Sequence, residues 1–127
     1  MMKLNSISGI TCYVEDLRRT SEFYQALGFR PGKEAPGRLT CYVNWFWVAF
    51  VEHGHDPGEE LSTRPQLPGN GAGLFTHIKV DDVGEAYRSV LAAGMKPDGE
   101  PEKSPSGNRE FILRDPDGYK LVFFGKR

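Results

Sequence analysis

Two stretches of the chain show the same succession of an alternating segment and a segment with helical spacing. Residues 7–14 and 74–80 alternate apolar and polar side chains, which predicts two β-strands with one buried face. Each is followed by apolar residues at helical spacing, over 17–27 and 83–93, which predicts two amphipathic helices. The chain therefore begins the same strand–helix unit twice.

The two units align without a gap over their strand and helix. The aligned pairs are Val14 and Val80, Asp16 and Asp82, Ala26 and Ala92, Gly28 and Gly94, and Pro31 and Pro97. Each aspartate precedes a predicted helix, where its carboxylate can accept hydrogen bonds from free backbone N–H groups. Each glycine stands where a left-handed helix end favours one. This agreement predicts two copies of one small unit.

Each predicted helix is followed by two segments with strand patterns. They are 38–43 and 46–52 in the first copy, and 110–114 and 119–124 in the second. The second pair flanks Asp115-Pro116-Asp117-Gly118, a strong turn signal. Weaker strand patterns occur at 30–33 and 96–99. Each copy is therefore predicted to be a β-α-β-β-β unit, which places the chain in the α+β class.

The expected organisation is a single domain over residues 1–127. The first module covers about 5–52 and the second about 74–125. The intervening residues 53–73 are rich in Pro and Gly, which predicts a linker or a flexible flap.

Charge and apolar content exclude several classes of protein. The 16 Lys and Arg against 17 Asp and Glu give a formal net charge of −1, which argues against a nucleic-acid-binding protein. The longest apolar run, 45–51, is far shorter than the roughly 20 residues of a membrane helix, and residues 1–6 lack the apolar core of a secretory signal. Cys12 and Cys41 lie in predicted strands without a CxxC spacing, which indicates reduced, buried thiols. We expect a cytoplasmic protein without membrane or nucleic-acid partners.

Three segments carry a resemblance to a known family. Val14-Glu15-Asp16-Leu17, Leu27-Gly28-Phe29 and the closing Asp115-Pro116-Asp117-Gly118 resemble the vicinal oxygen chelate superfamily, which includes glyoxalases, extradiol dioxygenases, fosfomycin-resistance enzymes and bleomycin-binding proteins. The resemblance covers roughly residues 7–124. It implies two tandem βαβββ modules that form an open, barrel-like sheet around a cleft, and it implies a homodimer. Because this fold hosts many activities, it does not by itself define one.

The resemblance also implies where a metal ion would bind in metal-dependent members. Those ligand positions, in the first and last strands of each module, fall here on Gly9, Phe75 and Val122, and on Ala49 or Phe50. None of these side chains has a ligating atom, whereas divalent metals need several imidazole, thiolate or carboxylate ligands. We therefore expect no metal site of the usual kind and no cofactor. A divalent metal held by other ligands is the alternative.

A second group of candidate metal ligands follows the predicted strand 46–52. It comprises Glu52, His53, His55 and Asp56. Their spacing matches neither a helical nor a CxxC-like ligand pattern, so we interpret them as solvent-exposed polar residues.

Period-two alternation predicts which side chains would line the cleft. The candidate ligand-binding residues are Tyr13, Trp45, Trp47, Phe75, His77, Lys79, Val122 and Phe124. An aromatic cleft with few polar groups suits a small, partly aromatic organic molecule. His77 is the candidate catalytic residue, as a general base or a donor to a ligand, although it can equally complete strand packing. Which face of Trp45-Phe46-Trp47 lines the cleft stays open, and Cys12 faces the helices by parity.

Three functions compete. The first is a metal-free protein that sequesters a small organic molecule, as the resemblance to bleomycin-binding proteins implies, with His77 or Lys79 positioning one polar group of the ligand. The second is a metal-dependent lyase or dioxygenase whose metal is held by His77 together with Glu52 or a residue of 53–73. The third is a dimeric interaction module without a ligand.

Overall fold

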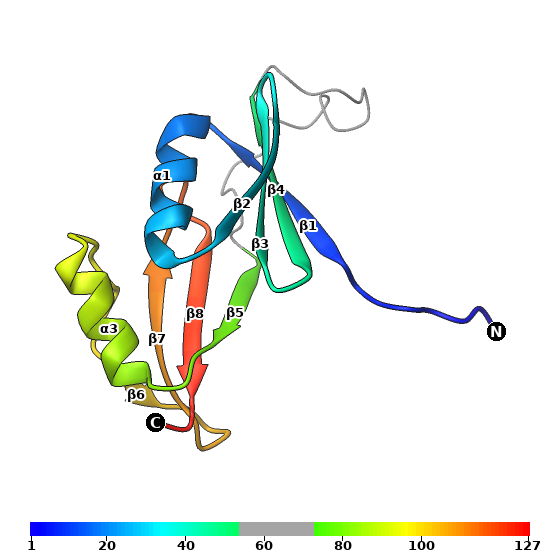
Figure 1. The fold of residues 1–127 in the computed structure, drawn as a ribbon. Coiled ribbons are helices and arrows are strands. Elements are labelled where there is room, and N and C mark those ends of the chain that lie inside the picture. The colour runs from blue at the N-terminus through cyan, green and yellow to red at the C-terminus, as the bar shows by residue number, and fades with distance from the viewer. Residues whose placement is uncertain (54–72) are drawn as a thin grey trace. The chain divides into compact units, whose positions relative to one another are not determined.

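The computed structural model describes residues 1–53 and 73–127 (Figure 1). The chain divides into two compact units, Met1–Leu67 and Pro68–Arg127. The predicted linker falls almost entirely on residues 54–72, outside the described part. Among the described residues, no helix has the length and apolar character needed to cross a membrane.

The first unit contains one four-stranded mixed sheet and one helix. Its elements are β1 (Gly9–Val14), α1 (Leu17–Leu27), β2 (Arg30–Ala35), β3 (Arg38–Val43) and β4 (Phe46–Glu52). The strand order is β1-β4-β3-β2, in which β1 pairs with β4 in parallel and the other pairs are antiparallel. Helix α1 contacts β2, β3 and β4.

The second unit repeats this topology. Its elements are β5 (Phe75–Lys79), α3 (Val83–Ala92), β6 (Glu102–Lys103), β7 (Arg109–Arg114) and β8 (Lys120–Gly125). The strand order is β5-β8-β7-β6, with β5 and β8 parallel. The predicted α+β class and the two βαβββ units are confirmed, and each sheet is open rather than closed on itself.

One predicted strand is misplaced. Residues 96–99 form no strand, and the short strand of the second unit lies instead at Glu102–Lys103. Pro97 and Pro101 have no backbone N–H, so this stretch cannot sustain a ladder beside β7. Asp98 nevertheless donates its backbone N–H to Ile112 O at 2.9 Å, which holds the stretch against β7.

The side of the first sheet that faces α1 forms the core of that unit. Phe50 is fully buried, and its ring lies 4.6 Å from the ring of Tyr24 of α1. Cys12 and Cys41 are buried free thiols, as predicted. Burial raises the pKa of the Cys41 thiol, which therefore stays protonated at neutral pH and is a poor nucleophile.

The second unit packs its helix in the same way. Phe111 stacks on Phe123 at 5.0 Å, and Tyr87 of α3 contacts Phe111 edge-on at 5.4 Å. Leu113 and Leu121 are buried on the same face. Leu121 and Phe123 therefore lie on the side of β8 that packs under the helix.

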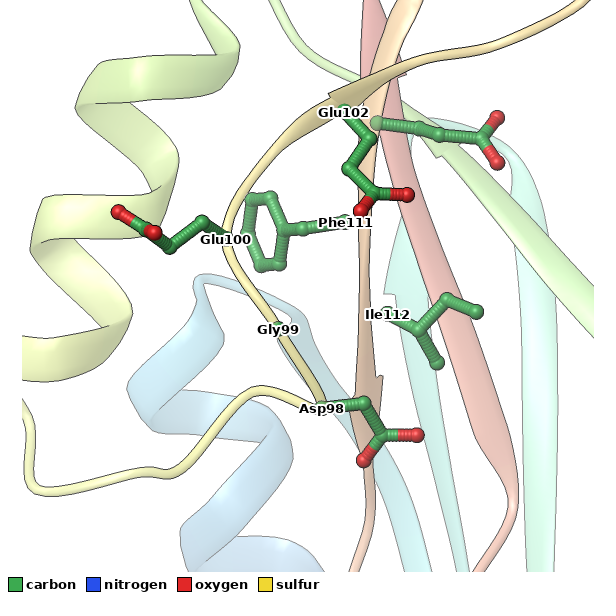
Figure 2. Close-up of a pocket in the computed structure, with 7 residues that line it drawn as sticks. Asp98, Gly99, Glu100, Glu102, Phe111 and Ile112 are labelled. Atoms are coloured by element: carbon green, nitrogen blue, oxygen red, sulfur yellow. The ribbon is translucent and has the colours of Figure 1, made fainter.

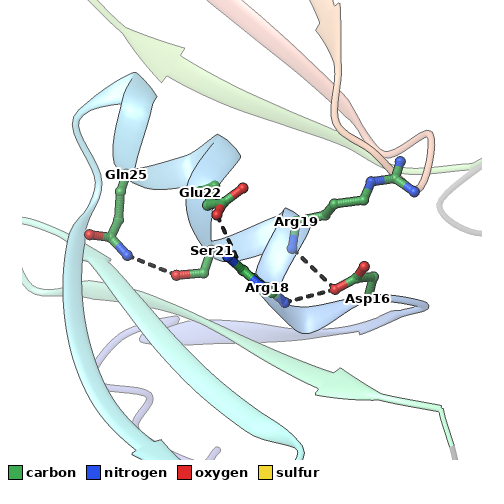
Figure 3. Close-up of polar contacts among 6 residues, drawn as sticks. All are labelled: Asp16, Arg18, Arg19, Ser21, Glu22 and Gln25. Carbon is green, nitrogen blue, oxygen red and sulfur yellow. Dashed lines mark hydrogen bonds and ion pairs between the residues drawn. The ribbon is translucent and has the colours of Figure 1, made fainter.

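Two carboxylates accept hydrogen bonds from the free backbone N–H groups at the start of α1. Asp16 is the N-cap, and its Oδ1 accepts from the backbone N–H groups of Arg18 and Arg19 at 3.0 and 3.2 Å (Figure 3). Glu52, at the end of β4, accepts from the N–H of Leu17 at 3.0 Å. These groups would otherwise lack partners at the helix start, so the last strand of the unit is bonded directly to its helix.

Asp82 is the N-cap of α3, and its Oδ1 accepts from the N–H of Glu85 at 3.0 Å. This hydrogen bond holds the pKa of Asp82 below its ordinary value of 3.8, and the positive charges of Arg127 and Arg88 act in the same direction. The folded state is therefore stabilised as long as the Asp82 carboxylate is charged.

Asp82→Asn removes this titration and keeps a capping side chain. A depressed folded-state pKa stabilises the protein above the unfolded-state pKa and loses that effect as the pH falls through the folded-state pKa. We expect the stability difference between wild type and Asp82→Asn to stay constant from neutral pH to about pH 5, and to shrink in acid. Urea unfolding across this range measures it, and a difference that does not change with pH would contradict the charge effect.

Candidate functional site

The face of the first sheet that points away from α1 carries the residues of interest. Strand register pairs Gly9 with Trp47 and Thr11 with Ala49, and directly paired residues share a face. Ala49 thus lies on this face, whereas Phe50 points to the helix. The position left open between Ala49 and Phe50 is therefore Ala49, which has no ligating atom.

Trp47 lies flat against the backbone of Gly9. A Cβ atom placed on Gly9 would be 2.1 Å from Cδ2 of the indole, and 2.4 Å from both Cε2 and Cε3. Three such similar distances to bonded ring atoms show that the face of the ring, not its edge, covers the glycine. The position at which the family resemblance implies a metal ligand is therefore a glycine covered by the indole.

Tyr42 is the cross-strand partner of Trp47 on the same face. Its ring lies over Gly32 of β2, where an added Cβ would be 2.5 Å from Cε1. The guanidinium of Arg30, the strand partner of Tyr42, lies 5.0 Å from the centre of that ring and donates from Nη2 to Asn44 O at 2.8 Å. We call Trp47 and Tyr42 the aromatic floor.

Sequence reasoning identified Trp47 but missed Tyr42 and Arg30. The available signal was Gly32 inside a strand pattern, because a glycine there often marks the close approach of another group.

Trp45 has a different environment from Trp47. It lies in the β3–β4 turn, next to Asn44 at φ +54°, and is 64% exposed. Its ring contacts Phe46 edge-on at 6.1 Å. Of the aromatic trio, Trp47 therefore lies on the sheet face opposite α1, and Trp45 lies at the end of the hairpin.

Tyr13 stacks on His53, with ring centres 5.7 Å apart and the planes inclined by 12°. His53 Nδ1 is buried and makes no hydrogen bond to the residues that the structure describes. Glu52 is engaged at the start of α1. His55 and Asp56, the other two members of the predicted polar cluster, lie outside the described residues.

The second sheet presents a corresponding face opposite α3. Register pairs Phe75 with Lys120, His77 with Val122, and Lys79 with Phe124, so the predicted alternation of β5 and β8 is confirmed. On this face, the Lys120 ammonium lies 5.1 Å from the centre of the Phe75 ring. The His77 ring lies 6.1 Å from that of Phe124, edge-on. Phe75, His77 and Lys79 are exposed, and Val122 is buried.

A cavity of about 190 Å³ lies at the β6–β7 side of this unit (Figure 2). It is lined by Asp98, Gly99, Glu100, Glu102, Glu110, Phe111 and Ile112. Glu102 and Glu110 are direct strand partners, which places two like charges opposite each other. Asp98 is paired with Arg114 at 3.1 Å. The sequence patterns did not predict this acidic cavity.

The residues present do not fit the metal site that the resemblance implies. Gly9, Ala49, Phe75 and Val122 provide no ligating side-chain atom. In residues 1–53 and 73–127, no three His, Cys, Asp or Glu side chains are grouped so that they could hold a metal ion.

Comparison with known proteins identifies relatives at the level of family and fold. The profile of the Glyoxalase/Bleomycin resistance protein/Dioxygenase superfamily matches residues 6–123, and no curated protein sequence matches the chain. A glyoxalase/bleomycin resistance protein/dioxygenase from Nocardioides has a similar structure, with TM-score 0.80, 19% identity, and coverage of 98% of this chain and 85% of that chain. A hypothetical protein from S. aureus gives TM-score 0.78, 21% identity, and coverage of 97% and 94%. A bleomycin-binding protein complexed with bleomycin gives TM-score 0.71, 22% identity, and coverage of 97% and 100%.

Proposed function

The chain belongs to the glyoxalase/bleomycin resistance protein/dioxygenase superfamily, and we propose that it binds a small, partly aromatic organic molecule without a metal ion. The observation that carries this proposal is the Trp47 indole lying flat on Gly9. Relatives that bind a metal ion need a ligand at this position, and here a glycine and an aromatic ring occupy it. The solved structure of a bleomycin-binding protein shows that a similar fold can hold an organic molecule.

Stacking on the exposed side of Trp47 is the proposed source of binding. An aromatic pair contributes about 0.5–1.5 kcal/mol beyond the burial of its surface. Because Trp47 is half-buried and its inner face rests on the sheet, little side-chain freedom is lost when a ligand stacks on its outer face. Retention of a ligand in this way requires neither a nucleophile nor a general base.

The face of the second sheet carries its own set of candidate ligand-binding residues. Phe75 and Phe124 provide apolar area, and His77 and Lys79 are the proposed partners for a polar group of a ligand that lies against them. His77 would act as a hydrogen-bond donor or acceptor here rather than as a catalytic base. The proposal also includes a homodimer in the cytoplasm, in keeping with the family resemblance and with two free thiols.

Two tryptophans make this proposal testable residue by residue. In a two-dimensional nitrogen–proton NMR spectrum, the indole N–H signal of Trp47 is expected to move on titration with bleomycin or naphthylmethanol, while that of Trp45 stays in place. Trp45→Phe and Trp47→Phe assign the two signals. Trp47→Leu is expected to weaken binding roughly three- to tenfold, and Trp45→Leu to leave it unchanged. A Trp47 signal that does not respond to either saturating probe would contradict the proposed surface.

The metal-free part of the proposal has its own measurement. Protein purified without chelators is expected to contain substoichiometric amounts of divalent metal in elemental analysis. Stoichiometric zinc, nickel, manganese or iron would instead support a metal-dependent lyase or dioxygenase that uses ligands outside the family positions.

A further inference from the structure

We propose that the first sheet selects planar aromatic carboxylates, with the aromatic floor holding the ring system and Arg30 holding the carboxylate. This inference rests on the proposed function and adds the chemical class of the ligand. The observation behind the inference is one row of residues that runs across the sheet. From β2 to β1, strand register aligns Arg30, Tyr42, Trp47 and Gly9 on the same face.

Glycines on β1 and β2, the strands at either side of this row, let its two aromatic rings lie close to the sheet backbone. Gly9 leaves room for Trp47 on one side, and Gly32 leaves room for Tyr42 on the other. A Cβ at either glycine would overlap its ring, so larger residues would lift the aromatic side chains away from the backbone. The result is a low, broad apolar surface of two half-buried rings, which suits a flat molecule better than a globular one.

Arg30 ends this row with a positive charge that is held in place. Its guanidinium stacks against Tyr42 at 5.0 Å and donates from Nη2 to Asn44 O at 2.8 Å. Arg30 is exposed, and within the described residues it makes no ion pair. A guanidinium has five N–H donors, so it keeps most of them for an incoming group.

The geometry of a guanidinium favours a carboxylate. Its planar donors match the two carboxylate oxygens in a bidentate arrangement. Arg30 and Trp47 stand two strands apart, roughly 10 Å at ordinary strand spacing. A two-ring aromatic acid can span this distance with its rings on the floor and its carboxylate at Arg30.

Three probes of similar size test this inference: naphthoate, the neutral naphthylmethanol and the cationic naphthylmethylamine. By calorimetric titration, naphthoate is expected to bind wild type about tenfold more tightly than naphthylmethanol, and naphthylmethylamine more weakly than both. Arg30→Gln is expected to abolish the preference for naphthoate and to leave the affinity for naphthylmethanol within about twofold. Arg30→Lys keeps the charge without the planar donors and is expected to give an intermediate preference.

Two variants serve as matched controls. Arg18→Gln changes the net charge by the same amount at an exposed position of α1 and is expected to keep the full preference. Lys120→Gln tests a second cation that lies over an aromatic ring in the described part of the chain, on the second sheet, and is likewise expected to keep the preference.

The outcomes separate this inference from the proposed function. Binding of naphthylmethanol with no preference for naphthoate, or a preference that survives Arg30→Gln, overturns the inference and leaves the proposed function standing. A preference lost in Lys120→Gln instead also overturns it, because the anion would then bind on the second sheet. Absence of binding by all three probes contradicts both.

Discussion

Gly9→Ala is expected to lower the free energy of unfolding by about 1–3 kcal/mol, the usual range for a methyl group forced into filled space. The new Cβ would be 2.1 Å from Cδ2 of Trp47 in the present geometry, so the indole or the strand must shift. Urea unfolding measures the change. Gly99→Ala is the matched control, because an added Cβ there meets no heavy atom within 4 Å.

A double variant shows whether the indole causes this effect. When Trp47→Ala is already present, adding Gly9→Ala is expected to cost little, which would appear as a coupling between the two sites in a double-mutant cycle. If Gly9→Ala is as mild as Gly99→Ala, the indole does not rest on Gly9 in solution. The main argument for a stacking surface in place of a metal ligand would then fail.

Phe50→Ala is expected to cost about 3–5 kcal/mol, the range for removing a buried phenylalanine ring. Phe50 is completely buried and packs against Tyr24 of α1. The substitution would therefore leave a cavity between the helix and the sheet and remove a contact that joins them. Trp45→Ala removes an even larger ring from an exposed turn and is expected to change stability by less than about 0.5 kcal/mol.

Denaturant unfolding of both variants tests the assignment of faces in β4. Ala49 faces away from α1 and Phe50 toward it. A loss below about 1 kcal/mol for Phe50→Ala would contradict this register, because a one-residue slip exchanges the two faces of a strand.

The strand and helix boundaries were largely predictable because short-range signals set them. Asp16 and Gly28 bound α1 as predicted, the second with φ +106°. Strands β3 and β4 have the predicted bounds, and the turn between them begins at Asn44, a residue type that tolerates its positive φ of +54°. The strand predicted at 96–99 was wrong because no short-range signal sets the position of this strand. The actual strand, β6, is only two residues long and forms through its pairing with β7, which no local pattern encodes.

The candidate site was less predictable because its shape depends on residues from different strands. Alternation correctly placed His77 and Val122 on one face of the second sheet. It could not show that Trp47 would lie on Gly9, since that requires the pairing of β1 with β4. Arg30 was missed because its role depends on Tyr42, which becomes its neighbour only when β2 and β3 pair.

The pairing of β6 with β7 has a consequence for self-association. Both residue pairs between these strands bring like charges opposite each other: Glu102 pairs with Glu110, and Lys103 pairs with Arg109. Such a strand is held weakly and stays short, and short charged strands at a sheet edge discourage another chain from extending the hydrogen-bond ladder. At the corresponding edge of the first sheet, β2 is exposed throughout and contains Pro31. Both borders are therefore poor templates for amyloid-like growth.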